Sequence, residues 1–128
     1  MRHFIIITNR PKDPHLETTD EIRRCLEQEG ASCSVYADEI SKEQWRRILE
    51  TEGRETEAIL VAGGDGTLLR AARDTADSRI PVLGINLGTL GYLAEVEKSN
   101  LKQALRQLLE GAYTVEERMM LSGHVVRI

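Results

Sequence analysis

The sequence alternates short apolar runs with amphipathic segments, and this alternation restricts the possible folds more than any other feature. The first run, Phe4-Ile5-Ile6-Ile7, is continuous and rich in β-branched residues, as is typical of a strand buried on both faces. Further strands are predicted at residues 32–36, 58–62 and 81–85, and helices at residues 16–29, 41–53, 68–76 and 99–110. Strands separated by helices predict an α/β fold, with a doubly wound, mostly parallel sheet and helices on both faces.

The pattern changes near the end of the chain. After Gly111, residues 113–121 and 125–128 predict strands, with a turn at Ser122-Gly123-His124. The last apolar run is cut by the chain end. We therefore expect residues 1–115 to form the α/β domain and residues 116–128 to be the first strands of a truncated, β-rich second domain.

Composition and charge narrow the possible partners. Of the 128 residues 41% are apolar, which is enough for a soluble globular protein with a core. With 17 basic and 21 acidic residues the net charge is −4, and the basic residues form no stripe. Electrostatics thus gives no reason to expect nucleic acid or a membrane as a partner. No apolar run approaches the ~18–20 residues of a membrane span, so a cytoplasmic protein is expected.

The strongest local motif is Gly63-Gly64-Asp65-Gly66-Thr67, which directly follows the third predicted strand. Glycines accept positive φ in tight turns and let a ligand approach the backbone. The next helix is expected to begin at about Thr67, so its first N–H groups would bind phosphate. We therefore predict that Gly63, Gly64 and Thr67 bind a nucleotide phosphate. The carboxylate of Asp65 would then hold a metal ion or accept a proton from an attacking hydroxyl.

Two well-known phosphate-binding motifs do not account for this turn. The P-loop pattern is absent, and the dinucleotide fingerprint fails because Leu69 stands where its last glycine belongs. A plain strand–helix connection capped by Asp65 remains an alternative. A second glycine-rich loop, Gly84-x-Asn86-x-Gly88-x-x-Gly91, follows the next strand. Carboxyl ends of neighbouring parallel strands meet in one crevice, so two such loops favour a ligand site.

Together these motifs resemble the paired signature of the NAD kinase family. Similarity also extends to the first strand and loop, Ile7-Thr8-Asn9-Arg10-Pro11-Lys12, and to Glu117-Arg118-Met119-Met120-Leu121, which resembles the entry to that family's second domain. The Gly-Gly-Asp-Gly-Thr turn alone is shared with phosphofructokinases, diacylglycerol kinases and sphingosine kinases. The loop containing Asn86 and Tyr92 narrows the resemblance to NAD kinases.

The resemblance implies that the complete enzyme transfers a phosphoryl group from ATP, or another donor, to the 2′-hydroxyl of the NAD adenosine ribose. It implies that Asp65 accepts the proton and contacts NAD together with Gly66, Arg70, Asn86 and Tyr92, where the family usually has Phe at the last position. A divalent cation, with Mg²⁺ favoured, would neutralise the donor phosphates. The full-length protein is expected to be a homo-oligomer.

The resemblance also implies that part of the NAD site lies in the second domain, so this chain by itself would hold an incomplete site. Two other functions remain open at this point. One is a lipid kinase of the same superfamily, which the acidic composition disfavours. The other is a nucleotide-binding module that does not catalyse. The three histidines, His3, His15 and His124, are widely separated and are expected at the surface or in turns rather than in a metal site.

Overall fold

Seven strands form one sheet in the part of the chain that the structure, a computed structural model, describes. This part comprises residues 2–9, 11, 13, 15–87, 96–118 and 123–127, with only the backbone of 117, 118, 123 and 127. The elements in chain order are β1 (His3–Thr8), α1 (Glu17–Gln28), β2 (Ser32–Tyr36), α2 (Lys42–Glu52), β3 (Thr56–Gly63), α3 (Asp65–Asp74), the 3₁₀ turn η1 (Ala76–Ser78), β4 (Val82–Asn86), β5 (Val96–Glu97), the 3₁₀ turn η2 (Lys98–Asn100), α4 (Leu101–Glu110), β6 (Thr114–Arg118) and β7 (Gly123–Arg127).

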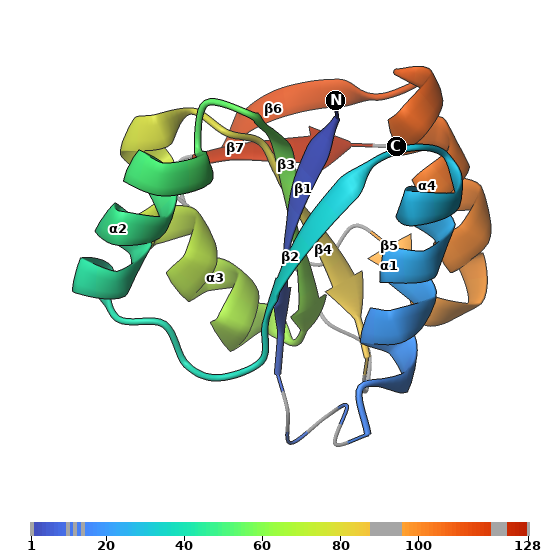
Figure 1. Cartoon of the computed structure of the whole chain (residues 1–128), viewed down its shortest axis with the longest axis horizontal. Helices are drawn as coiled ribbons and strands as arrows, with labels where there is room; N and C mark the ends of the chain where they lie inside the picture. Colours follow the sequence, from blue (N-terminus) through green and yellow to red (C-terminus); the bar gives the residue numbers. More distant parts are fainter. Residues whose placement is uncertain are drawn as a thin grey trace.

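The strand order is β2-β1-β3-β4-β7-β6, with β5 beside β4. All neighbouring strands are parallel except β6 and β7, which form an antiparallel hairpin. Helices α1 and α4 cover one face of the sheet, and α2 and α3 cover the other (Figure 1). The predicted α/β fold, with a mostly parallel sheet between two helical layers, is therefore confirmed.

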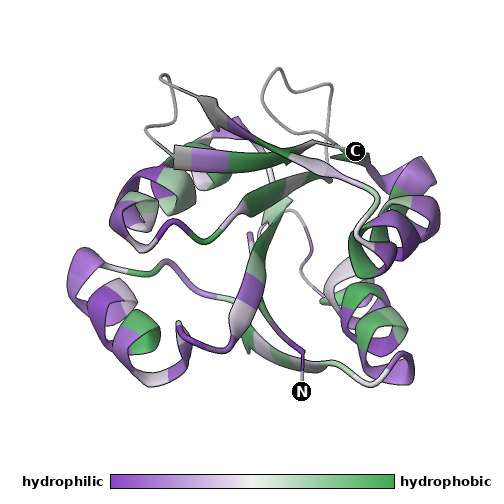
Figure 2. Cartoon of the chain, turned by 90° about the horizontal axis from the view of Figure 1, so that it is seen from above, coloured by the Kyte–Doolittle hydropathy of each residue, from purple (hydrophilic) through white to green (hydrophobic). Residues whose placement is uncertain are grey.

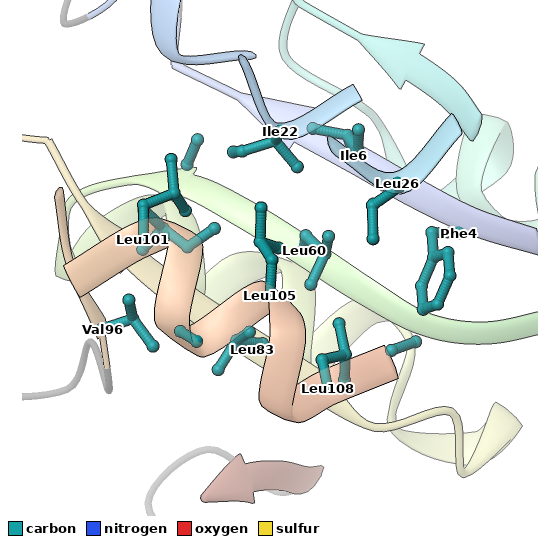
Figure 3. Close-up of a cluster of buried hydrophobic side chains, with 14 of the residues drawn as sticks. Phe4, Ile6, Ile22, Leu26, Leu60, Leu83, Val96, Leu101, Leu105 and Leu108 are labelled. Carbon is teal, nitrogen blue, oxygen red and sulfur yellow. The ribbon is translucent and has the colours of Figure 1, made fainter. Parts of the chain in front are cut away.

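The continuous apolar run of β1 is explained by its central position. Successive side chains of a strand point to opposite faces. Phe4 and Ile6 accordingly pack in the cluster beneath α1 and α4, where Figure 3 shows them beside Leu26 and Leu60. Ile5 and Ile7 instead pack in the cluster beneath α2 and α3. A strand covered on both faces has no polar side, so its sequence does not alternate.

The helices turn one apolar face to the sheet and leave charged residues outside. On α4 the buried positions Leu101, Leu105 and Leu108 recur at helical spacing. Seen from above, each helical layer carries both hydrophobic and hydrophilic residues (Figure 2). Among the described residues no helix is both long and apolar enough to cross a membrane.

Local side-chain and backbone features fix the ends of two helices. Ser41 caps α2 in a capping box with Gln44, each side chain bonded to the other's backbone N–H. Gly30, with φ of 87°, follows α1 in the left-handed conformation that glycine favours. The predicted turn at 122–124 is wrong for Gly123 and His124, which belong to β7, and Ser122 lies outside the described residues.

Candidate functional site

The candidate site lies where β1, β3 and β4 reach their carboxyl ends. From β1 the chain proceeds to β2 on one side, whereas β3 lies on the other side of β1, so the gap between β1 and β3 is a topological switch point. Ligands of open α/β sheets bind at such a point, outside the carboxyl ends of the strands. The residues that end or directly follow these strands, namely Asn9, Gly63 and Asn86, are therefore candidates for contact with a ligand.

Strand pairing brings these three residues side by side. Thr8 of β1 is in register with Ala62 of β3, and the N–H of Asn9 donates to the carbonyl oxygen of Ala62 at 2.9 Å. On the other flank Gly63 is in register with Asn86, the last residue of β4. Asn86 is buried at the strand end, with 8% of its surface exposed. The end of β3 is therefore flanked by an asparagine on each side.

Helix α3 begins immediately after β3. Gly64 is its N-cap with extended backbone (φ −109°, ψ −172°), and the N–H of Leu68 donates to the carbonyl oxygen of Gly64 at 3.1 Å. The helix therefore starts at Asp65, two to three residues earlier than predicted, and Asp65 and Gly66 belong to its first turn. The first N–H groups of a helix make no bond within it, and glycine offers no side chain to cap them. This end of α3 is thus suited to bind an anion.

The glycines at the junction of β3 and α3 allow close packing of neighbouring side chains at one position and access for a ligand at another. The expectation of positive φ is wrong for Gly64, and among the described glycines only Gly30 and Gly111 have positive φ. A Cβ on Gly63 would lie 3.1 Å from the Cβ of Asn9 and 3.2 Å from the Oγ1 of Thr67, closer than ordinary van der Waals contact, so these side chains would have to shift by a few tenths of an ångström. Gly66 is exposed, and a Cβ there would meet nothing within 4 Å. A ligand can therefore reach the backbone at Gly66.

Most of the predicted site residues are brought together here. Gly63, Gly64, Asp65, Gly66, Thr67 and Arg70 lie at the end of β3 and in the first turns of α3, and Asn86 adjoins them from β4. Asp65 is partly exposed in the first turn of α3, where a carboxylate is favoured by the helix dipole. Tyr92, with Gly88 and Gly91 of the second loop, lies outside the described residues.

Arg70 forms an ion pair that the sequence did not suggest. Its Nη1 donates to Oε1 of Glu39 at 2.6 Å, which links α3 to the segment after β2. Both side chains are well exposed, 60% for Arg70 and 77% for Glu39. Exposed pairs of this kind contribute about 0–1 kcal/mol, so Arg70 can exchange Glu39 for an anionic ligand at small cost.

Asn9, to which no role in the site was assigned from the sequence, also lies at the β3–α3 junction. Its Nδ2 lies 3.4 Å from the Oγ1 of Thr67, and its Cβ would lie 3.1 Å from a Cβ added to Gly63. The signal that could have found it is positional, because an amide directly after the strand next to the switch point faces the ligand crevice.

A buried carboxylate fixes the loop that carries Asn9. Asp13 accepts hydrogen bonds from the N–H of Thr19 at 3.0 Å and from its hydroxyl at 2.9 Å, and so caps the start of α1. Its own N–H donates to the carbonyl oxygen of Asn9 at 3.1 Å. Burial alone would raise the pKa of Asp13, but the hydrogen bonds from the start of α1 outweigh it and hold the pKa below its ordinary value.

A pocket of about 280 Å³ opens beside the start of α3. Its walls come from the ends of β1 and β2, from α2 and from α3, and they combine apolar with polar side chains. The lining residues are Ile7, Asn9, Pro11, Ala37, Asp38, Glu39, Ile40, Trp45, Thr67, Arg70 and Ala71. A larger hollow of about 660 Å³ lies between α1 and α4 and contains none of the candidate residues. We therefore associate the smaller pocket with the site.

Asp65 is the carboxylate that the described part of the β3–α3 junction contributes to the candidate site. Among the described residues no three His, Cys, Asp or Glu side chains are grouped so that they could hold a metal ion. Mg²⁺ is commonly bound by one or two carboxylates together with substrate phosphates. The residues therefore fit a cation that arrives with a nucleotide, with Asp65 as the carboxylate of the turn.

Comparison with known proteins gives a consistent family relation. Residues 4–113 match the family model described as the ATP-NAD kinase N-terminal domain. The chain is 37% identical over 130 residues to an NAD kinase of Lachnospira eligens, covering 99% of this chain and 44% of the relative. It is 41% identical over 127 residues to an NAD kinase of Agathobacter rectalis, covering 97% of this chain and 44% of the relative. The chain thus spans less than half the length of these curated relatives.

Solved structures share the fold at low sequence identity. A yeast NADH kinase complexed with NADH aligns with a TM-score of 0.63 and 18% identity, over 90% of this chain and 40% of that one. A 3-dehydroquinate dehydratase-like protein from Bifidobacterium longum aligns with a TM-score of 0.53 and 15% identity, over 88% of this chain and 98% of that one. At these identities the likeness concerns the fold alone.

Proposed function

The chain belongs to the NAD kinase family, and from this premise we propose that it supplies the nucleotide-binding half of an enzyme that phosphorylates NAD to NADP. The observation that carries the proposal is the junction of β3 and α3. There Asp65 occupies the first turn of a helix whose N-terminus can bind phosphate, beside an exposed Gly66 and at the switch point of the sheet.

The proposed reaction is an in-line phosphoryl transfer. The oxygen of the 2′-hydroxyl of the NAD adenosine ribose forms a bond to the γ-phosphorus of ATP, and the bond between that phosphorus and the β,γ-bridging oxygen breaks. ADP leaves, and the carboxylate of Asp65 accepts the hydroxyl proton. The N–H groups at the start of α3 stabilise charge on the phosphates. Positioning and charge stabilisation supply most of the catalysis in such transfers, so this half of the site needs few reactive side chains.

The remaining assignments follow from the family relation. Gly66, Arg70, Asn86 and Tyr92 would contact NAD, and Gly63, Gly64 and Thr67 would surround a phosphate. A divalent cation, Mg²⁺ by preference, would enter with the nucleotide and neutralise its phosphates. NAD and ATP are the proposed small-molecule partners, in a cytoplasmic enzyme that assembles as a homo-oligomer.

The proposal is tested by replacing Asp65 in the full-length protein. Asp65→Asn keeps the size of the side chain but removes its basicity, so NADP formation should fall by about 10²- to 10⁴-fold. The free energy of unfolding should change little, because Asp65 is partly exposed. Asp77→Asn, an exposed carboxylate in η1 beyond the far end of α3, serves as the matched control and should keep full activity.

Near-normal turnover in the Asp65→Asn enzyme would remove Asp65 from the mechanism. Absence of NADP formation in the unmodified protein, with NAD and every phosphoryl donor offered, would reject the proposed activity as a whole.

A further inference from the structure

We propose that Asn9 is a positioning residue, which turns the hydroxyl group of Thr67 toward a phosphate bound at the start of α3. The side-chain amide of Asn9 donates to the oxygen of Thr67 and leaves the hydroxyl proton for the phosphate. This role rests on the proposed function, but it holds whichever of the two substrates places a phosphate there. It is supported by the fixed backbone of Asn9, by the hydrogen bonding of the Thr67 hydroxyl and by the packing of both side chains against Gly63.

The backbone of Asn9 is held on both sides. Its N–H donates to the carbonyl oxygen of Ala62 on β3 at 2.9 Å, and its carbonyl oxygen accepts from the N–H of Asp13 at 3.1 Å. Asp13 is itself buried and bonded to Thr19 at the start of α1. Asn9 follows Ile7 by two residues, and Ile7 packs beneath α2 and α3, so the alternation of a strand directs Asn9 to the same face. The amide therefore has a fixed base and faces α3.

The hydroxyl group of Thr67 is bonded differently from those of two other helical threonines. Thr51 of α2 and Thr75 at the end of α3 each donate to the carbonyl oxygen four residues earlier, at 2.8 and 2.7 Å, and this bond occupies the hydroxyl proton. Thr67 makes no such bond, and within the described part of the chain its side chain is bonded only to the amide of Asn9. Because an NH₂ group can only donate, Oγ1 of Thr67 accepts, and its own proton is available to an anion.

Asn9 and Thr67 meet over Gly63, at the first turn of α3. A Cβ at Gly63 would lie 3.1 Å from the Cβ of Asn9 and 3.2 Å from the Oγ1 of Thr67, so the glycine lets the two side chains approach each other. Thr67 is the third residue of α3, beside the first N–H groups, which make no bond within a helix. The Thr67 proton and these N–H groups can therefore bind one anion. At 3.4 Å the bond from Asn9 is longer than the usual range of about 2.7–3.2 Å, and we expect it to shorten when a phosphate polarises the hydroxyl.

The test is a double-mutant cycle on the binding of inorganic pyrophosphate to the full-length protein, measured by titration calorimetry. Asn9→Ala and Thr67→Val should each weaken binding about 3- to 10-fold, as expected for one lost hydrogen bond. Asn9→Ala should cause no further loss when Thr67 is already Val, because Asn9 acts through the Thr67 hydroxyl. Thr51→Val is the matched control, since it removes a hydroxyl whose proton is bonded to the carbonyl oxygen of Arg47, and it should bind pyrophosphate like the unmodified protein.

Asn9→Asp separates positioning from packing. Aspartate has nearly the same shape, but its carboxylate accepts the Thr67 proton and so turns the hydroxyl away from the phosphate. Asn9→Asp should therefore weaken pyrophosphate binding more than Asn9→Ala, and kcat/KM for NADP formation should fall in the same order.

The role of Asn9 is overturned if the losses of Asn9→Ala and Thr67→Val multiply in the double variant, or if either change leaves pyrophosphate binding unaltered. It is also overturned if the unmodified protein binds no pyrophosphate. Should the protein bind pyrophosphate with the expected pattern but form no NADP, the proposed activity fails, whereas the action of Asn9 through Thr67 is upheld.

Discussion

Glu52 is held between side chains of two strands at the edge of the sheet. Its Oε1 lies 2.7 Å from Nε2 of His3 on β1, and its Oε2 accepts from the hydroxyl of Tyr36 on β2 at 2.7 Å. Burial alone would raise the pKa of Glu52, but the hydrogen bonds from His3, Tyr36 and Ser34 outweigh it and lower the pKa. Burial, followed by the bond to Glu52, raises the pKa of Tyr36 to about 12.

These shifts predict how stability depends on pH. The lowered pKa of Glu52 stabilises the fold above about 4.5, its ordinary value, and this contribution is lost as pH falls through the folded pKa. The raised pKa of Tyr36 stabilises the fold below pH 10, and this contribution is lost as pH rises from 10 to about 12. Tyr36→Phe should therefore make the alkaline decline of the free energy of unfolding shallower, measured by urea denaturation between pH 8 and 12, the span set by these pKa values.

Some alkaline decline should persist in Tyr36→Phe, because burial also raises the pKa of Cys33, to about 11. Tyr113→Phe is the matched control, since Tyr113 packs on the other face against the α1 and α4 cluster, and it should retain the full decline. Equal declines in the Tyr36→Phe variant and the unmodified chain would show that ionisation of Tyr36 contributes nothing to the alkaline decline.

The contacts of Glu52 with His3 and Tyr36 could not be predicted from the sequence. His3 was expected at the surface, which is wrong, because only 9% of it is exposed. Its partners Ser32 and Glu52 stand 29 and 49 residues away, and the pairing of β1 with β2 and the packing of α2 bring them together. No local pattern encodes either contact.

At the scale of elements, the two glycines on either side of Gly64 and Asp65 have separable roles. Gly63→Ala should lower the free energy of unfolding by about 1–3 kcal/mol, because its new Cβ would press on Asn9 and Thr67. Gly66→Ala has open space and a helical position, so it should keep or raise stability by at most ~1 kcal/mol. The same methyl group would obstruct the ligand, so NADP formation by the full-length protein should fall.

Urea denaturation and the activity assay on the same two variants check this separation. The explanation is contradicted if Gly66→Ala lowers the free energy of unfolding more than Gly63→Ala does. It is also contradicted if Gly66→Ala keeps full activity in NADP formation.

The ends of helices and strands were predicted well only where the residues at the end itself carry a signal. Strand β2 was predicted with the bounds that the structure shows, residues 32–36, because its pattern of Ser, Cys, Val and Tyr residues is local. The start of α3 was placed too late, since its apolar face becomes visible only at Leu68 and the residues before it are glycine, aspartate and threonine. The candidate site itself was found from its motif, whereas Asn9 and Glu39 join it only through the order of the strands.

At the scale of the whole molecule, the C-terminal hairpin joins the same sheet as the α/β elements. Val82 of β4 is in register with Val125 of β7, and β7 pairs with β6. Val125 packs in the cluster beneath α2 and α3, and Val126 packs in the cluster beneath α1 and α4. Assignment of residues 116–128 to a second domain remains a proposal, and the chain covers only 44% of the length of each of two NAD kinase relatives.

Truncation of one buried valine distinguishes a hairpin that stabilises the α/β core from one that folds separately. Val126 is fully buried, so Val126→Ala should lower the free energy of unfolding by roughly 1–3 kcal/mol. Val115 on β6 is 44% exposed, and Val115→Ala should change it by less than about 0.5 kcal/mol. Trp45 on α2 lies outside the hairpin and reports the unfolding of the α/β core. If the hairpin stabilises this core, the urea transition followed by Trp45 fluorescence should move to lower urea concentration in Val126→Ala. An unmoved Trp45 transition would instead favour residues 116–128 as the beginning of a separate domain.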